Sequence, residues 1–308
     1  MSALQAGRTQ FRVDVTQVAG LDGTAHLSIE LLLPDNGMPH LLFVCVPGGG
    51  MNSRYFDLAT PAGEQEVSFS KAMLTRGHGV MLIDPLGVGN STLPEDAYLL
   101  HPDRMAASHA LAVEHVLNSL RNGTLVGGLP PAPDIRSVGV GHSMGALLTV
   151  VQQAAQPLHD GLALLGFHTA GLPDQLTQAD LDLDRTDARA RLAELARLRF
   201  PVGFLPPNPT PSRRPLSTNA ALDRINLAPS YMTMLPDMIA ADAARITVPL
   251  LLAVGDNDLH TDPHQMPASY PGSKDISLLV LEDTRHNHFI FPSRSRLFER
   301  VALWAEAL

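Results

Sequence analysis

The chain has 308 residues, of which 45% are hydrophobic, and its formal net charge is −9 at pH 7. This length is sufficient for one large domain with a buried core, or for one domain with an insertion. The acidic balance argues against a surface that binds polyanions, so we do not expect nucleic acid as a partner.

The sequence also lacks the features of secretion and membrane insertion. Residues 1–15 contain no apolar core of a signal peptide, and no longer window is apolar enough to span a bilayer. The single cysteine, Cys45, excludes an internal disulfide and lies in an apolar run, which favours a buried structural thiol over a nucleophile. We therefore expect a cytoplasmic protein that does not bind membranes.

The strand and helix patterns alternate along most of the chain. Residues 10–18 and 25–33 alternate apolar and polar positions around a Leu-Asp-Gly turn, which predicts an antiparallel pair of strands. Apolar runs then recur, each ending in glycine or polar residues as a buried parallel strand does. These runs lie near residues 41–46, 80–83, 137–141, 161–166, 249–254 and 276–281. Helical patterns between them, such as 104–120 and 294–308, predict an α/β fold with a mostly parallel central sheet flanked by helices.

The segment 172–244 interrupts this alternation. It contains a charged helical stretch at 186–199, then a proline-rich run and a Leu- and Met-rich run. We predict a helical cap or lid insertion over a substrate pocket, with a subdomain that only packs against the core as the alternative. The predicted α/β core then comprises residues 1–171 and 245–308, and the cap comprises 172–244.

The sequence Gly141-His142-Ser143-Met144-Gly145 lies where a predicted strand is followed directly by a helix. A sharp turn at such a junction leaves no room for side chains two positions to either side of its apex, and it exposes the apical hydroxyl above the sheet. This context predicts that Ser143 is a nucleophile. A serine hydroxyl then needs a base that takes its proton, usually a histidine held by a carboxylate.

Two later strand ends supply an acid and a base. The run ending in Gly-Asp-Asn-Asp carries Asp256 and Asp258, and the run ending in Arg-His-Asn-His carries His286 and His288. If the sheet is parallel, these strand ends lie at the same edge as Ser143, so the side chains can converge from three loops.

This order of Ser, Asp and His at strand ends resembles the α/β-hydrolase fold superfamily, from about residue 41 to the C-terminus. In relatives the acid closes a Gly-x-x-Asp pattern, which implies Asp258, with Asp256 as the second choice. The histidine follows the last strand, which implies His286 before His288, although Arg285 replaces the glycine that usually precedes it.

The run Val-Pro-Gly-Gly-Gly after the first central strand resembles the His-Gly-Gly-Gly oxyanion loop of esterases, with Pro47 in place of the histidine. The resemblance implies that the oxyanion is held by the N–H groups of Gly49 and Met144, with Gly50 as the next choice. The stretch 84–91 resembles a scaffold loop of the superfamily, so Asp84 is expected to shape the loop rather than to catalyse.

A metal site is the competing interpretation of the same loops. Its candidate ligands are His260, His264, His286, His288, Asp256, Asp258 and Asp262. No His-Glu-x-x-His or other closed ligand spacing is present, so we expect neither a metal nor a cofactor. His142 and His168 are expected to line the pocket or the core.

The sequence therefore predicts a cofactor-free serine hydrolase that cleaves a carboxylic ester of an apolar, small-to-medium substrate through an acyl-enzyme. The alternatives are a thioesterase, a lactonase or a C–C bond hydrolase that uses the same triad. A protein of the same fold that binds a small molecule without catalysis is the alternative from another functional class.

Overall fold

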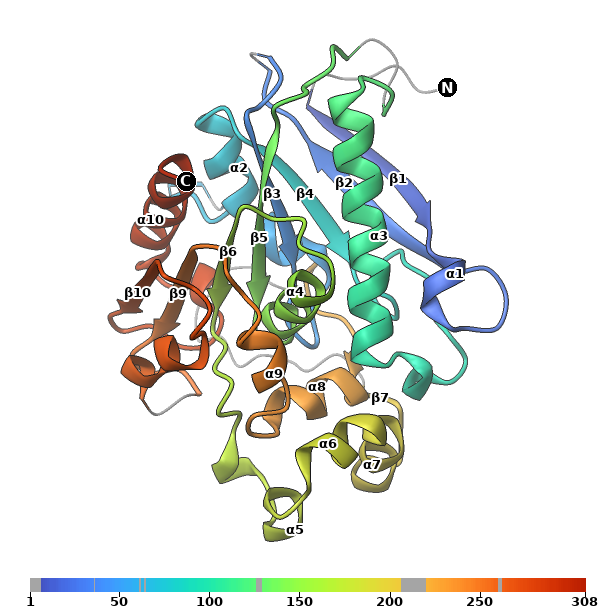
Figure 1. The fold of residues 1–308 in the computed structure, drawn as a ribbon. Helices are drawn as coiled ribbons and strands as arrows, with labels where there is room; N and C mark the ends of the chain where they lie inside the picture. The colour runs from blue at the N-terminus through green and yellow to red at the C-terminus, as the bar shows by residue number, and fades with distance from the viewer. Residues whose placement is uncertain are drawn as a thin grey trace.

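In the described part of the chain, an eight-stranded sheet forms the centre of the computed structural model (Figure 1). The structure describes residues 7–35, 37–60, 62–63, 65–125, 129–205, 220–259 and 262–308. The strands are β1 (Arg8–Asp14), β2 (His26–Leu32), β3 (Leu41–Val46), β4 (Gly79–Asp84), β5 (Arg136–His142), β6 (Gly161–Leu165), β9 (Leu250–Gly255) and β10 (Ile276–Leu281).

The strand order is β1-β2-β4-β3-β5-β6-β9-β10. Strands β1 and β2 pair antiparallel, β2 pairs antiparallel with β4, and the remaining neighbours are parallel. This topology confirms the predicted α/β fold with a mostly parallel central sheet. The parallel strands all end at the same edge, which is the lower edge in Figure 1.

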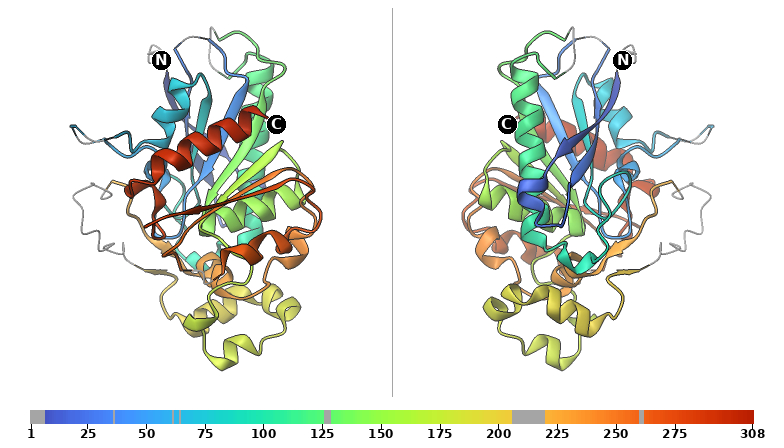
Figure 2. Two further views of the ribbon diagram at one scale, coloured as in Figure 1. Left: turned by 90° about the vertical axis from the view of Figure 1, so that its left-hand side faces the viewer. Right: turned by 90° about the vertical axis from the view of Figure 1, so that its right-hand side faces the viewer.

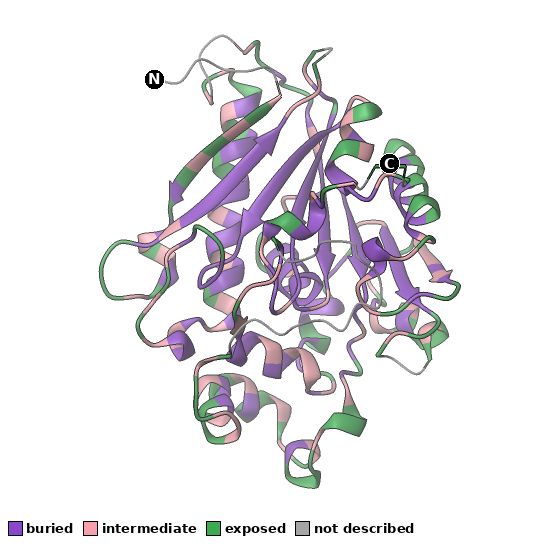
Figure 3. Ribbon diagram, turned by 180° about the vertical axis from the view of Figure 1, so that it is seen from behind, coloured by how far each residue is buried: buried purple, intermediate pink, exposed green. Residues whose placement is uncertain are grey.

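Helices cover both faces of the sheet, as the side views show (Figure 2). One face carries α1 (Thr16–Ala19), α3 (Pro102–Arg121) and α4 (Met144–Ala155), and the other carries α2 (Phe69–Thr75) and α10 (Arg294–Glu306). Every residue of β3 is buried. The inner strands are buried almost throughout in Figure 3, whereas the edge strands β1 and β10 are only partly buried. Burial on both faces explains the continuous apolar runs of the central strands.

Alternate residues of β3 enter different cores. Leu42 and Val44 belong to the hydrophobic cluster beneath α3 and α4, whereas Phe43 and Cys45 belong to the cluster beneath α2 and α10. This alternation follows from the two-residue period of a strand. Cys45 is a free, buried thiol, and its burial raises its pKa well above the usual value.

The predicted first strand is too long. Strand β1 ends at Asp14, and 16–19 form α1 instead of continuing the strand to 18. The pairing of β1 with β2 ends at Asp14 and His26. The chain therefore reverses between residues 15 and 25, and the reversal includes Gly20 in a left-handed conformation after α1.

The segment between β6 and β9 contains several short elements. They are η3 (Pro173–Gln175), α5 (Gln178–Leu181), α6 (Arg185–Ala190), α7 (Leu192–Arg199), β7 (Phe204–Leu205), β8 (Ile225–Asn226), α8 (Leu227–Met234) and α9 (Ala240–Ala243). Figure 1 shows α5 to α9 beyond the carboxyl ends of the strands. The segment includes the predicted cap range 172–244, of which 206–219 lie outside the described residues.

The helix predicted at 186–199 is divided into α6 and α7. Arg191 separates them with a non-helical backbone at φ −110° and ψ 11°. Its guanidinium lies 3.1 Å from Asp187 and 3.3 Å from Glu194, so one side chain links the two helices by ion pairs. The side chains of these pairs are exposed, so the pairs contribute little to stability.

The remaining described elements are short 3₁₀ helices in the loops. They are η1 (Ser53–Phe56), η2 (Ala97–Leu99), η4 (Pro263–Ser269) and η5 (His288–Ile290). Among the described residues, no helix combines the length and apolar character that crossing a bilayer requires.

Candidate active site

Ser143 lies at the sharp junction between β5 and α4. Its backbone has φ 52° and ψ −121°, a conformation that a residue with a side chain rarely adopts. A β-carbon at Gly141 would lie 2.4 Å from the Cα of Ala146, and one at Gly145 would lie 2.1 Å from the carbonyl oxygen of Val46. Both glycines are therefore required sterically, and the strained turn presents the Ser143 side chain at the carboxyl edge of the sheet.

Asp258 and His286 are joined by a hydrogen bond. The Nδ1 atom of His286 lies 2.6 Å from Oδ1 of Asp258, which also accepts the backbone N–H of Leu259 at 2.7 Å. Burial opposes the ionisation of Asp258, but hydrogen bonds from His286 and His288 outweigh it and hold the pKa of the carboxyl well below its usual value. Asp258 is therefore a buried carboxylate that orients an imidazole.

Gly166, directly after β6, leaves the space that this pair occupies. A β-carbon at this position would lie 3.3 Å from the ring of His286 and 3.4 Å from Oδ2 of Asp258. The backbone of Gly166 is left-handed at φ 59°, and its N–H donates to the carbonyl oxygen of Ala253 at 2.8 Å. The end of β6 is thereby held against β9 while the two catalytic candidates fit beside it.

His142 connects the Ser143 turn to the loop of His286. Its Nε2 donates a hydrogen bond to the carbonyl oxygen of His286 at 2.8 Å, and the two imidazole rings lie 4.9 Å apart between centroids. Among the hydrogen bonds of the described residues, none links the Ser143 hydroxyl to His286. Catalytic hydrogen bonds are often longer in an enzyme without substrate, so this arrangement is compatible with a serine and its base.

Asp256 occupies a different position from Asp258. Its carboxylate accepts the backbone N–H groups of Thr284 at 3.1 Å and Asp283 at 3.0 Å. These hydrogen bonds lower its pKa. Asp256 thus fastens the loop after β10, and the structure brings Asp258, not Asp256, into contact with the two histidines of that loop.

The glycine loop after β3 lies directly beside Ser143. A β-carbon at Gly48 would lie 3.1 Å from the Cβ of Ser143, and one at Gly49 would lie 3.8 Å from Sδ of Met144. Met144 is the first residue of α4, where backbone N–H groups have no acceptor within the helix. The two predicted oxyanion donors therefore belong to neighbouring segments.

A residue beyond the predicted set also reaches this loop. The hydroxyl of Ser230, on α8, lies 3.5 Å from Sδ of Met144 and would lie 2.9 Å from a β-carbon at Gly49. The β6–β9 segment thus contributes a polar group directly beside the two candidate oxyanion donors.

Residues 220–223 form hydrogen bonds with the glycine loop and the residues that follow it. Asp223 donates its N–H to the carbonyl oxygen of Gly50 at 2.8 Å. Its Oδ2 accepts hydrogen bonds from Nδ2 of Asn52 at 3.2 Å and from the N–H of Gly89 at 2.9 Å. One carboxylate therefore joins the glycine loop to the loop that follows β4.

Asp84 is a structural residue, as expected from the resemblance of the stretch 84–91 to a scaffold loop. Its buried carboxylate accepts the N–H groups of Ser53 and Asn90, each at 2.9 Å, and its carbonyl oxygen accepts the hydroxyl of Ser91 at 2.5 Å. It ties two loops to the end of β4 and contacts neither Ser143 nor His286 through these bonds.

The metal interpretation finds no support in these loops. Among the described residues, no group of three or more His, Cys, Asp or Glu side chains is placed to hold a metal ion. Asp262 instead accepts the N–H of His264 at 3.1 Å and the amide of Gln265 at 2.7 Å. His260 lies outside the described residues.

Comparison with known proteins identifies the family. The sequence model of the alpha/beta hydrolase family matches residues 43–301. The chain belongs to the alpha/beta hydrolase family. No curated protein matches the chain.

Solved structures show the same family fold. A thermophilic esterase from Thermogutta terrifontis is 18% identical with a TM-score of 0.59, over 96% of this chain and 98% of that one. A monoacylglycerol lipase from Paleococcus ferrophilus is 20% identical with a TM-score of 0.59, over 91% and 97%. A bromoperoxidase from Bacillus anthracis is 14% identical with a TM-score of 0.61, over 97% and 100%. These identities are low, and the three proteins are named for different activities. The likeness therefore shows a shared fold and not a shared substrate.

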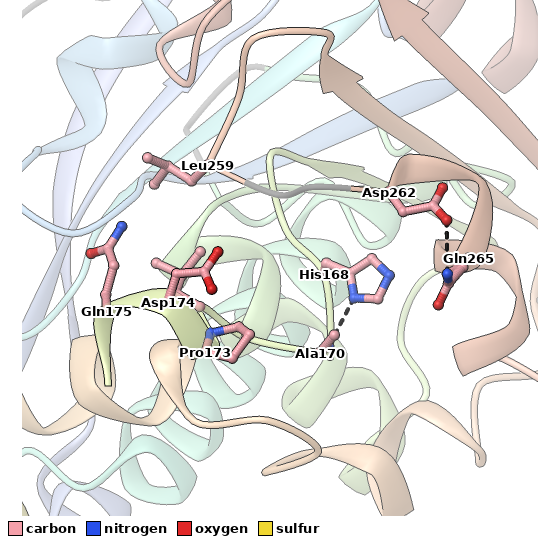
Figure 4. A pocket seen from close by; sticks show the side chains of 10 residues that line it. His168, Ala170, Pro173, Asp174, Gln175, Leu259, Asp262 and Gln265 are labelled. Carbon is pink, nitrogen blue, oxygen red and sulfur yellow. Dashed lines mark hydrogen bonds between the residues drawn. The ribbon is translucent and has the colours of Figure 1, made fainter. Parts of the chain in front are cut away.

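A pocket of about 130 Å³ opens between the chain that follows β6 and the chain that follows Asp258 (Figure 4). His168 lines this pocket, and Nδ1 of His168 accepts a hydrogen bond from the N–H of Ala170 at 2.8 Å. The lining is mixed in polarity and comprises His168, Ala170, Gly171, Leu172, Pro173, Asp174, Gln175, Leu259, Asp262 and Gln265.

The sequence does not predict the contacts of His142, Asp223 and Ser230. His142 precedes the serine in the turn motif, and that adjacency is the one signal that places it near the candidate site. Asp223 and Ser230 lie in the segment between β6 and β9, outside any motif. Their contacts depend on how that segment returns to the sheet.

Proposed function

We propose that the chain is a serine hydrolase that cleaves a carboxylic ester of an apolar, small-to-medium substrate. The observation that carries this proposal is the 2.6 Å hydrogen bond between His286 and a buried Asp258, beside a strained turn that presents Ser143. Membership of the alpha/beta hydrolase family supports the hydrolytic reaction.

In the proposed reaction, His286 takes the proton of the Ser143 hydroxyl while the serine oxygen attacks the ester carbonyl. Asp258 holds the imidazole and stabilises its charged form. The N–H groups of Gly49 and Met144 accommodate the negative oxygen of the tetrahedral intermediate. His286 then gives its proton to the departing alcohol, and it later activates the water that releases the acid and regenerates Ser143.

Apolar side chains around the glycine loop support an apolar acyl group. A β-carbon at Gly49 would lie 3.9 Å from Ile225, and a β-carbon at Gly50 would lie 3.0 Å from it. Sδ of Met144 would lie 3.8 Å from the same β-carbon position at Gly49. An acyl chain that extends from the oxyanion position toward these atoms would meet Ile225 and Met144, with the hydroxyl of Ser230 beside them. We propose that the β6–β9 segment, which contributes Ile225, is the cap of the substrate site.

Labelling with a fluorophosphonate probe tests the nucleophile. Wild-type protein should be labelled at Ser143, and Ser143→Ala should not be labelled. Ser230→Ala is the matched control, because it removes a different hydroxyl near the same loop and should still be labelled. Absence of labelling in the wild type, or equal labelling of Ser143→Ala, would refute the proposal and favour a non-catalytic binding protein.

A panel of p-nitrophenyl acetate, butyrate and octanoate tests the substrate class. We expect kcat/KM to be at least as high for butyrate and octanoate as for acetate, because longer chains bury more apolar surface. A steep preference for acetate would contradict the apolar acyl site while leaving the serine mechanism intact. Turnover should be lost in Ser143→Ala for every ester.

A further inference from the structure

Asp258 binds two histidines, one on each carboxylate oxygen. Oδ1 faces Nδ1 of His286 at 2.6 Å and the N–H of Leu259 at 2.7 Å. Oδ2 faces Nε2 of His288 at 2.9 Å. The side chains of Asp258 and His288 are both 0% exposed, whereas that of His286 is 25% exposed. His286 can therefore meet a substrate, while His288 is closed off from solvent.

The protonation state of His288 follows from its partners. An ionised carboxylate accepts hydrogen bonds and donates none, so Nε2 of His288 carries the proton. Its Nδ1 has no hydrogen-bond partner among the described residues. Burial lowers the pKa of His288 and outweighs the opposing effect of Asp258. A neutral ring protonated at Nε2 satisfies all of these conditions, because a charged ring would bury an unpaired Nδ1–H.

The surroundings of His288 keep its ring in place. It is the first residue of η5, and the next residue, Phe289, stacks on Tyr55 at 4.6 Å between ring centroids. The ring of His142 meets the ring of His288 edge to face at 5.7 Å. The N–H of His288 also donates to the carbonyl oxygen of His286 at 3.1 Å. The ring is thus a packed part of the aromatic core and is not placed to exchange protons with a substrate.

We propose that His288 is a positioning residue, which holds Oδ2 of Asp258 so that Oδ1 stays aligned with His286. This inference rests on the proposed function, in which Asp258 orients the base. Without the Nε2–H of His288, Oδ2 would be a buried charged acceptor with no partner. The carboxylate would then turn toward another donor, and its bond to His286 would lose alignment. Small misalignments of this kind reduce turnover more than substrate binding.

Two substitutions that replace the His288 ring by a side-chain amide test this role. In His288→Gln the amide nitrogen can reach the position of Nε2, whereas in His288→Asn it reaches only as far as Nδ1 and stops short of Asp258. We expect His288→Gln to keep kcat within about 3-fold of wild type, and His288→Asn to lose about 10- to 100-fold in kcat with KM nearly unchanged. Equal kcat values in the two variants would overturn the proposal.

Nuclear magnetic resonance supplies readouts that do not need turnover. The wild type and Ser143→Ala should show His288 protonated at Nε2 and not at Nδ1, together with a downfield proton resonance from Nδ1 of His286. That resonance should persist in His288→Gln and disappear or move upfield in His288→Asn. Protonation of His288 at Nδ1 in the wild type, or an unchanged resonance in His288→Asn, would overturn the proposal.

These readouts separate the two proposals. If no ester is hydrolysed and no probe reacts, but the resonances behave as stated, the proposed function fails and the positioning role of His288 stands. If Ser143 reacts and esters are hydrolysed, but His288→Asn behaves as His288→Gln does, the positioning role fails and the proposed function stands. The wild-type measurement of the His288 ring remains decisive even if a substituted chain does not fold.

Discussion

The carbonyl oxygen of His286 accepts a hydrogen bond from Nε2 of His142, at 2.8 Å. His142 directly precedes Ser143 in the chain, so the turn that carries the candidate nucleophile also holds the backbone of the candidate base. Burial lowers the pKa of His142 well below its usual value, which keeps its ring neutral. A neutral ring that donates through Nε2 fixes the separation of two loops without adding a charge to the site.

Replacing His142 by phenylalanine should therefore reduce catalysis. The phenyl ring can still pack against Tyr55, whose ring lies 4.7 Å from that of His142, but it cannot donate to His286. We expect kcat to fall by about 10-fold, corresponding to about 1.4 kcal/mol, with a smaller change in KM. Steady-state kinetics with a p-nitrophenyl ester measures this, and His142→Gln, which restores a donor, should recover part of the loss. An unaltered kcat in His142→Phe would contradict the role of this bond.

Substitution of the two aspartates in the loop after β9 should affect kcat to very different extents. In Asp258→Asn one carboxylate oxygen becomes a donor, so the side chain can no longer accept from both His286 and His288. We expect kcat to fall by about 10³- to 10⁴-fold, as expected when the base loses its orienting carboxylate.

Asp256→Asn is the matched control for this change. It keeps one acceptor oxygen for the N–H groups of Thr284 and Asp283, so it should cost about 1 kcal/mol of unfolding free energy and less than about 10-fold in kcat. Parallel kinetics and urea unfolding on the two variants measure the difference. A nearly inactive Asp256→Asn beside an active Asp258→Asn would reverse the assignment of the acid.

The carboxylate of Asp223 should support the glycine loop. Asp223→Ala removes the acceptor for Asn52 and Gly89 but leaves the backbone bond to Gly50 in place. We expect kcat/KM to fall by about 10-fold, because a looser glycine loop holds its N–H donors less well. Arg224→Ala, at the exposed neighbouring position, should leave kcat/KM within about 2-fold of wild type. Equal kinetics in the two variants would show that the carboxylate does not support the loop.

Buried neutral histidines should make the fold less stable in mild acid. Burial lowers the pKa of His109 from 6.5 to about 4, so between these values the unfolded chain binds a proton that the folded chain does not. The unfolding free energy must therefore decrease as the pH falls from about 6.5 to 4, by about 2 kcal/mol at pH 5 for this residue. His109→Leu should remove that part of the decrease, as measured by urea unfolding at pH 7.5 and pH 5.

His159 provides the comparison for His109. Burial likewise lowers its pKa to about 4, but its ring nitrogens lie 3.0 Å from Oγ of Ser137 and 2.9 Å from Oε1 of Gln152. Both ring nitrogens of His109 lack a partner among the described residues. His159→Leu should therefore lose about 1–3 kcal/mol at pH 7.5, whereas His109→Leu should be nearly neutral there. A strong destabilisation of both variants at pH 7.5 would contradict this distinction.

The sequence by itself determined the sheet and the Ser143 turn. The fold class was predictable because strands covered on both faces must be apolar at every position, as 41–46 are, and such runs are visible without coordinates. The glycines at 141 and 145 were predictable for a similar reason, since a side chain at 141 would collide with the start of α4 and one at 145 with the end of β3. These constraints are local, so a short stretch of sequence records them.

The tertiary structure decided which side chains meet. Asp256 and Asp258 are two residues apart in one loop, and so are His286 and His288 in another, so spacing alone leaves four possible pairs. The paths of the loops bring Asp258 against both histidines and turn Asp256 toward the backbone of Thr284. Contacts between separate loops depend on three-dimensional paths set by the whole core, and no local pattern encodes them.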